Sequence, residues 1–66
     1  MTKDKALSIV ASLLAMDTAS HLQASKEMPS LQENTAYATE RNQDVVNALG
    51  IETEYLKALI FHFPTP

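Results

Sequence analysis

The residues of this chain that could carry acid–base or metal chemistry are few and scattered. Asp17 and His21 are four positions apart, so in a helix their side chains share one face and can pair, usually as a solvent-exposed contact rather than a catalytic dyad. His62 stands between two phenylalanines, where a histidine more often stabilises a helix end than binds a ligand. No serine lies in a nucleophile elbow, and neither a glycine-rich phosphate loop nor a metal-ligand spacing occurs. We therefore expect no enzyme, and no catalytic, cofactor-binding or metal-binding residue.

The size of the chain limits what can stabilise it. It has 66 residues, which we interpret as a single domain over 1–66, and it contains no cysteine that could form a disulfide. A domain near this length buries only about 60% of its unfolded surface and is marginally stable alone. Close helix packing or oligomerisation must then supply the remaining stability. Ala and Leu are frequent and glycine occurs once, which favours helices.

The charges argue against nucleic acid and membranes as partners. The net charge is −3 and the five Lys and Arg residues are scattered, whereas a nucleic-acid binder usually carries a basic face. No apolar run reaches the ~20 residues that span a bilayer. Lys3 and Lys5 precede the apolar segment 6–16, as in a secretory signal, but Asp4 interrupts the basic start and serines dilute the apolar run. We expect a cytoplasmic protein.

The first helix is expected from an N-cap at Thr2 to about Lys26, before Pro29. Its apolar residues form two adjacent stripes, which together make a wide apolar face: Leu7, Val10 and Leu14 in one, Ile9, Leu13 and Met16 in the other. The opposite face carries the small residues Ser8, Ser12, Ala15 and Ala19. We expect this small-residue face to meet solvent. The alternative is a close helix–helix contact, because small side chains let two backbones approach.

The second helix is expected from a capping box at Ser30 and Glu33 to Leu49. Gly50 follows at the position where a left-handed residue closes a helix, with Ile51 packing back on Val46. The seam of this helix consists of Leu31, Thr35, Ala38, Asn42, Val45 and Leu49. Asn42 either fixes register inside the interface or lies at its edge in water, and the sequence leaves both open.

The third helix is expected from Glu52 or Thr53 to Phe63, with an apolar stripe of Tyr55, Leu56, Leu59, Ile60 and Phe63. Phe61 points away from that stripe, so the end of this helix is apolar almost all round. The second helix has a narrow seam and cannot cover both of its neighbours. We therefore expect a homodimer or a larger homo-oligomer, whose interface draws on Leu13, Asn42, Tyr55, Leu59, Ile60, Phe61 and Phe63.

The segment 42–61 resembles the helix-turn-helix family of DNA-binding domains. With Gly50 as the turn glycine, the apolar positions of that pattern fall on Val45, Leu49, Ile51, Leu56 and Leu59. The position that packs under the turn, usually Ala in the family, is Val46. The resemblance implies that the second helix of the pair would read base edges in the major groove. That helix would present Glu52 and Glu54 at its groove-facing end, where carboxylates repel phosphate.

These patterns predict an all-α fold: a small three-helix domain with a long helical hairpin and a short C-terminal helix, assembled as an oligomeric bundle. The expected function is that of a small, non-catalytic oligomeric adaptor or regulator that acts by binding another protein. The alternative is a helix-turn-helix DNA-binding transcriptional regulator. A DNA reader needs basic residues on the exposed face of its second helix, and only Lys57 qualifies.

Overall fold

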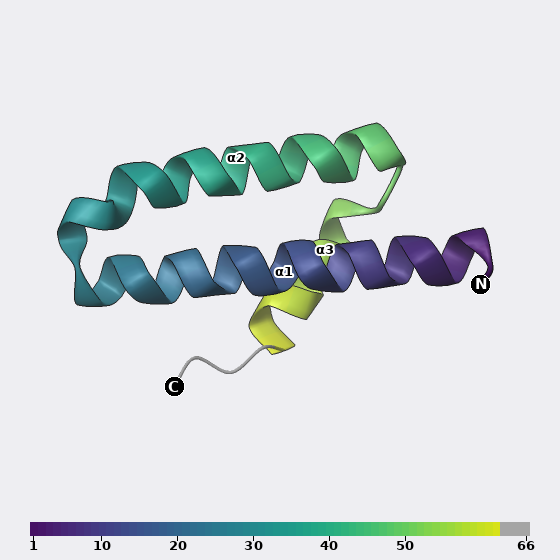
Figure 1. The fold of residues 1–66 in the computed structure, drawn as a ribbon, viewed down its shortest axis with the longest axis horizontal. Coiled ribbons are helices and arrows are strands. Elements are labelled where there is room, and N and C mark those ends of the chain that lie inside the picture. Colours follow the sequence, from purple (N-terminus) through teal and green to yellow (C-terminus); the bar gives the residue numbers. More distant parts are fainter. Residues whose placement is uncertain (63–66) are drawn as a thin grey trace.

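The computed structural model describes residues 1–62 of the chain, and these form an all-α domain. Its elements are α1 (Lys3–Glu27), the 3-10 turn η1 (Pro29–Leu31), α2 (Gln32–Leu49) and α3 (Thr53–His62). The long helices α1 and α2 run antiparallel as a hairpin, and α3 crosses α1 (Figure 1). No strand occurs over residues 1–62, so the predicted three-helix fold is confirmed. Within the same range, no helix is both long and apolar enough to cross a membrane.

The hairpin turn follows from local chemistry, with one correction. The Thr2 hydroxyl accepts a hydrogen bond from the Lys5 amide at 3.1 Å, so the predicted N-cap of α1 is confirmed. Met28 is extended, with φ −131° and ψ 94°, as the following proline requires. The predicted capping box at Ser30 and Glu33 is wrong. Ser30 lies inside the 3-10 turn rather than in the extended conformation of an N-cap, and α2 begins at Gln32 without a side-chain cap.

Gly50 ends α2 in the predicted way. Its φ of 74° lies in the left-handed region, where a side chain would be strained. The Ile51 amide donates to the Val46 carbonyl at 3.0 Å, and the Gly50 amide donates to the Asn47 carbonyl at 3.3 Å. These two bonds define a Schellman motif and turn the chain sharply into α3.

The face of α1 that packs inside the domain carries small residues. Its buried residues are Ala11, Ala15, Thr18 and Ala19. The interpretation of the Ser8, Ser12, Ala15 and Ala19 face as solvent-facing is therefore wrong for its two alanines. Leu56 of α3 and Val46 of α2 meet Ala15 in the core, because an alanine at a helix crossing lets neighbouring helices approach closely.

The buried seam of α2 differs from the predicted one at its C-terminal end. Thr35, Ala38, Asn42 and Val46 are buried, whereas Val45 is half-buried and Leu49 is exposed. A strict seven-residue repeat would have selected Val45 and Leu49. A straight helix has 3.6 residues per turn, so its contact line drifts from that repeat and passes through Val46 instead.

Candidate interaction surface

A polar network joins α1 to α2 at the middle of the hairpin, and Asn42 is its centre. The Asn42 side chain is 1% exposed, so it lies inside the seam and not at its edge. Its amide nitrogen donates to the Thr18 hydroxyl at 2.9 Å and to the Asp17 carboxylate at 2.9 Å. Its amide oxygen accepts from the Nε and Nη2 atoms of Arg41, each at 3.2 Å. Every polar atom of this buried amide therefore has a partner, as a stable core requires.

Asp17 connects the network to solvent. Its Oδ2 accepts from Arg41 Nη2 at 2.7 Å, and the two side chains remain 40% and 49% exposed. The hydrogen bond from Asn42 lowers the pKa of Asp17 below its ordinary value, and the nearby charges of His21 and Arg41 act in the same direction, while partial burial opposes them. The carboxylate is thus held ionised, where it binds both Asn42 and Arg41 across the helix pair.

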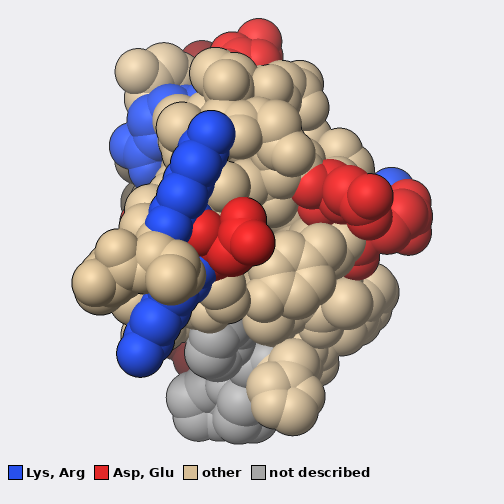
Figure 2. Space-filling view, turned by 90° about the vertical axis from the view of Figure 1, so that its right-hand side faces the viewer, with Lys and Arg blue, Asp and Glu red and all other residues tan. Residues whose placement is uncertain are grey.

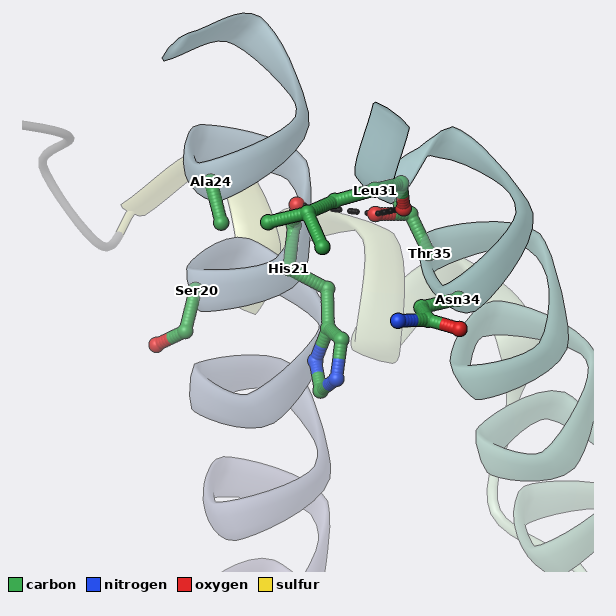
Figure 3. Close-up of a pocket in the computed structure, with 6 residues that line it drawn as sticks. All are labelled: Ser20, His21, Ala24, Leu31, Asn34 and Thr35. Carbon is green, nitrogen blue, oxygen red and sulfur yellow. Dashed lines mark hydrogen bonds between the residues drawn. The ribbon is translucent and has the colours of Figure 1, made fainter. Parts of the chain in front are cut away.

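The predicted Asp17–His21 pair exists, but it has no catalytic geometry. His21 Nδ1 lies 2.7 Å from the Asp17 carbonyl oxygen and 3.6 Å from its Oδ1, so the imidazole donates mainly to the backbone. The His21 ring hangs in the gap between α1 and α2, beside Asn34, while Ser20 points away from it (Figure 3). These residues line an open groove of about 310 Å³ between the two helices. Thr35 also lines it, and its hydroxyl lies 3.0 Å from the carbonyl oxygens of both His21 and Leu31.

Over residues 1–62, no three His, Asp or Glu side chains converge on one point. The titratable residues that do converge, Asp17, His21 and Arg41, are engaged with one another or with backbone groups of the hairpin. A buried and satisfied amide in a helical seam, such as that of Asn42, is the kind of group that can fix the register of one helix against another.

The predicted interface residues fall into three environments. Leu59 and Ile60 are half-buried against the core formed by Ala15, Val46 and Leu56, so much of their surface is used within the chain. Asn42 is fully enclosed by its own hairpin and offers nothing to a second chain. The exposed members are Leu13 at 59%, Tyr55 at 42% and Phe61 at 89%. Phe63 lies outside the described residues.

Tyr55 and Phe61 extend the apolar character of α3 to its outer surface. The Tyr55 hydroxyl lies 3.1 Å from the Ser8 hydroxyl of α1, and this contact ties the Tyr55 side chain to α1. Phe61 lies about 140° around the helix from the buried Leu56, at 100° per residue, and so faces away from the core. At 89% exposed, Phe61 presents apolar surface that association with a partner would remove from water.

An exposed apolar stripe on α1 adds Ile9 and Met16 to the interface residues that were predicted from the sequence. Ile9 is 41% exposed and Met16 is 49% exposed, and both lie on the same side of the helix as Leu13. Their pattern was visible in the sequence as one of two adjacent stripes. Which side of α1 becomes buried depends on where α2 and α3 pack, and both pack on the side opposite this stripe.

The charged side chains are distributed with both signs on the face drawn in Figure 2. Basic side chains gather on its left and carboxylates at its centre and right, without a continuous basic surface on this face. On α3, Glu54 and Lys57 are exposed and form an i, i+3 ion pair at 3.7 Å. The single lysine of α3 is thus paired with a carboxylate of the same helix.

No known protein-family model, curated protein or solved structure matches this chain.

Proposed function

We propose that this protein is a small, non-catalytic homo-oligomeric adaptor that acts by binding another protein. The observation that carries this proposal is the imbalance between its buried and exposed apolar side chains. Among residues 1–62, the buried hydrophobic residues are four alanines, Val46 and Leu56. Larger side chains, among them Leu13, Met16 and Phe61, stand 49–89% exposed. Burying such side chains against a second chain would add roughly 25 cal/mol for each Å² of apolar surface removed from water.

Self-association supports the stability of a chain this small. A domain of 66 residues is expected to be stable by only a few kcal/mol, on the order of 0.1 kcal/mol per residue. The exposed stripe of α1 and the end of α3 would each leave water on association, and either contribution is comparable with that total. A two-fold dimer is the commonest closed assembly that buries such surfaces.

Sedimentation equilibrium at tens of micromolar tests the oligomeric part of the proposal. We expect a mass above that of the 7.3 kDa monomer, falling toward it on dilution. A single 7.3 kDa species at every concentration would refute self-association. Phe61→Asp is expected to shift the mass toward monomer if α3 reaches the second chain. Tyr37→Asp is its matched control, because Tyr37 is also a large exposed aromatic residue at 70% and lies on α2.

The adaptor part is tested by affinity capture from the native host, followed by identification of the bound molecules. The proposal expects a protein that co-purifies in fixed stoichiometry with the tagged chain and rebinds when both are purified. Retention of nucleic acid, or of nothing that rebinds, would contradict it.

The helix-turn-helix resemblance of 42–61 supports a second candidate, a DNA-binding transcriptional regulator. The observation in its favour is the glycine turn at Gly50, which leads from α2 directly into α3. The exposed carboxylates of Glu52 and Glu54 at the start of α3 weigh against it. A gel-shift titration at low salt is expected to show no binding at micromolar protein, and tight, salt-sensitive binding would make this the leading candidate.

A further inference from the structure

The exposed face of α1 has a nearly symmetric pattern about Leu13. Its residues are Ala6, Ile9, Leu13, Met16 and Ser20, at spacings of three, four, three and four. Counted from Leu13, the large apolar residues lie four positions before and three after it, and small residues lie seven positions to each side. Two copies of such a face fit each other when one is turned end for end, because large side chains then meet large ones and small meet small.

The stripe residues themselves carry no charge, and Asp17 lies beside them, about 40° around the helix from Leu13 at 100° per residue and 40% exposed. Between Ala6 and Ser20 the one charged residue of α1 is Asp17, whose carboxylate is engaged by Asn42 and Arg41 of α2. The flanking Lys3, Asp4 and Lys5 all lie N-terminal to the stripe. A second copy covers the uncharged stripe residues and leaves the Asp17–Arg41 pair in water at the edge of the contact, which avoids the cost of burying a charge.

We infer that the occupant of this face is a second copy of the chain, packed antiparallel, with Leu13 beside the two-fold axis. The inference deepens the proposed function and rests on its oligomeric part. In this arrangement Ile9 of one copy lies opposite Met16 of the other, offset by about 1.5 Å along the helix axis. A parallel pair would instead bring the lysines of both N-termini together and align the two helix dipoles. The antiparallel pair separates those charges and opposes the dipoles.

The contact that this arrangement forms is small compared with a stable protein interface. The stripe from Ala6 to Ser20 is about 21 Å long at 1.5 Å per residue, so a helix pair with axes about 8–10 Å apart covers only a few hundred Å² per chain. A standard stable interface covers about 800 Å² per partner. The dimer is accordingly weak and reversible, and Met16 gives the contact a side chain that adapts easily to its neighbours.

Cysteine crosslinking tests this geometry, and the chain is suited to it because it has no cysteine of its own. The single variants Leu13→Cys, Ile9→Cys and Met16→Cys are oxidised with oxidised glutathione, alone and mixed in pairs, at a concentration where wild type is dimeric. A disulfide needs Cα atoms within about 7 Å of each other. In the antiparallel pair the two copies of position 13 meet this limit, while the copies of position 9 are about 12 Å apart along the axis and those of position 16 about 9 Å apart.

The expected result is a crosslinked Leu13→Cys homodimer and a crosslinked mixture of Ile9→Cys with Met16→Cys. Ile9→Cys alone and Met16→Cys alone should form at least tenfold less, close to the level of Tyr37→Cys, which reports random collision. Equal homodimer crosslinking at all three α1 positions would mean a parallel pair and would overturn the inference. So would crosslinking of Phe61→Cys in the absence of Leu13→Cys crosslinking. In both of those cases the chain is still an oligomer and the proposed function stands. A monomeric wild type in sedimentation would instead remove the oligomeric part of the proposed function together with this inference.

Discussion

Replacing Asn42 with alanine probes the polar network that joins the two long helices. The change removes the hydrogen bonds at 2.9 Å to Asp17 and to Thr18. A bond to a charged group contributes about 1.5–3 kcal/mol and a neutral one about 0.5–1.5 kcal/mol, and some of this is returned because the buried amide no longer needs to be desolvated. We expect Asn42→Ala to lower the free energy of unfolding by about 2–3 kcal/mol. The total is expected to be about 3–10 kcal/mol for a chain of this length, so the loss is large.

Urea denaturation followed by circular dichroism measures this change. Wild type and variant are compared at equal chain concentration, because self-association adds to apparent stability. Asn34→Ala is the matched control, since it makes the same substitution at an exposed site of the same helix and should stay within about 0.5 kcal/mol of wild type. A double-mutant cycle of Asn42→Ala with Thr18→Val should show a coupling of about 0.5–1.5 kcal/mol for the bond they share.

Two outcomes would refute this reasoning. If Asn42→Ala and Asn34→Ala lose the same small amount, the network does not stabilise the hairpin and Asn42 is merely tolerated. If the cycle shows no coupling while Asn42→Ala is strongly destabilising, the bond to Thr18 contributes nothing, and the loss comes from the bonds to Asp17 and Arg41 or from a packing defect.

Three further predictions concern the turn, the acid stability and the buried face of α1. Gly50→Ala should destabilise by about 1 kcal/mol through backbone strain alone, because φ is 74° and no atom lies within 4 Å of the added methyl; a neutral denaturant melt would mean that the turn tolerates a side chain. Because the pKa of Asp17 is lowered by folding, its stabilising contribution is present above the ordinary carboxyl pKa and is lost as the pH falls through the lowered value. Urea melts of wild type and Asp17→Asn should therefore converge on acidification below about pH 4, and a constant difference would contradict this. Ala15→Leu should cost about 1–3 kcal/mol by overpacking the helix crossing, whereas a stabilised variant would show that this face has unfilled space.

The breaks between the helices were predictable from single residues because they depend on local backbone chemistry. Pro29 restricts the residue before it, and Met28 is extended as a result. Gly50 reaches a φ that other residues avoid, and α2 closes on it. The capping box was equally local and still failed. Two local signals competed at this point, and the 3-10 turn that begins at Pro29 took Ser30 out of the extended conformation that an N-cap needs.

The environment of Asn42 could not be decided from its helix alone. Its place in the α2 seam was evident from its spacing, but a buried amide is stable only where partners satisfy it. Those partners, Thr18 and Asp17, lie 24 and 25 residues away on α1 and meet Asn42 only when the hairpin closes in one register. Leu59 and Ile60 were likewise assigned to a shared interface, and the fold uses much of their surface within the chain.

The sequence by itself determined that α1 is a helix with a wide apolar face, and it predicted that the narrow seam of α2 could not cover both of its neighbours. It did not determine which side is covered, because the periodicity of such a helix points in several directions at once. The tertiary structure decided which side is covered, because helices pack where their backbones can come close together. Helices α2 and α3 pack against the alanines, whose small side chains allow the backbones to come near, and Ile9, Leu13 and Met16 are left on the outside. The candidate interaction surface is thus made of residues that the sequence displays plainly and that only the packing of the other two helices leaves exposed.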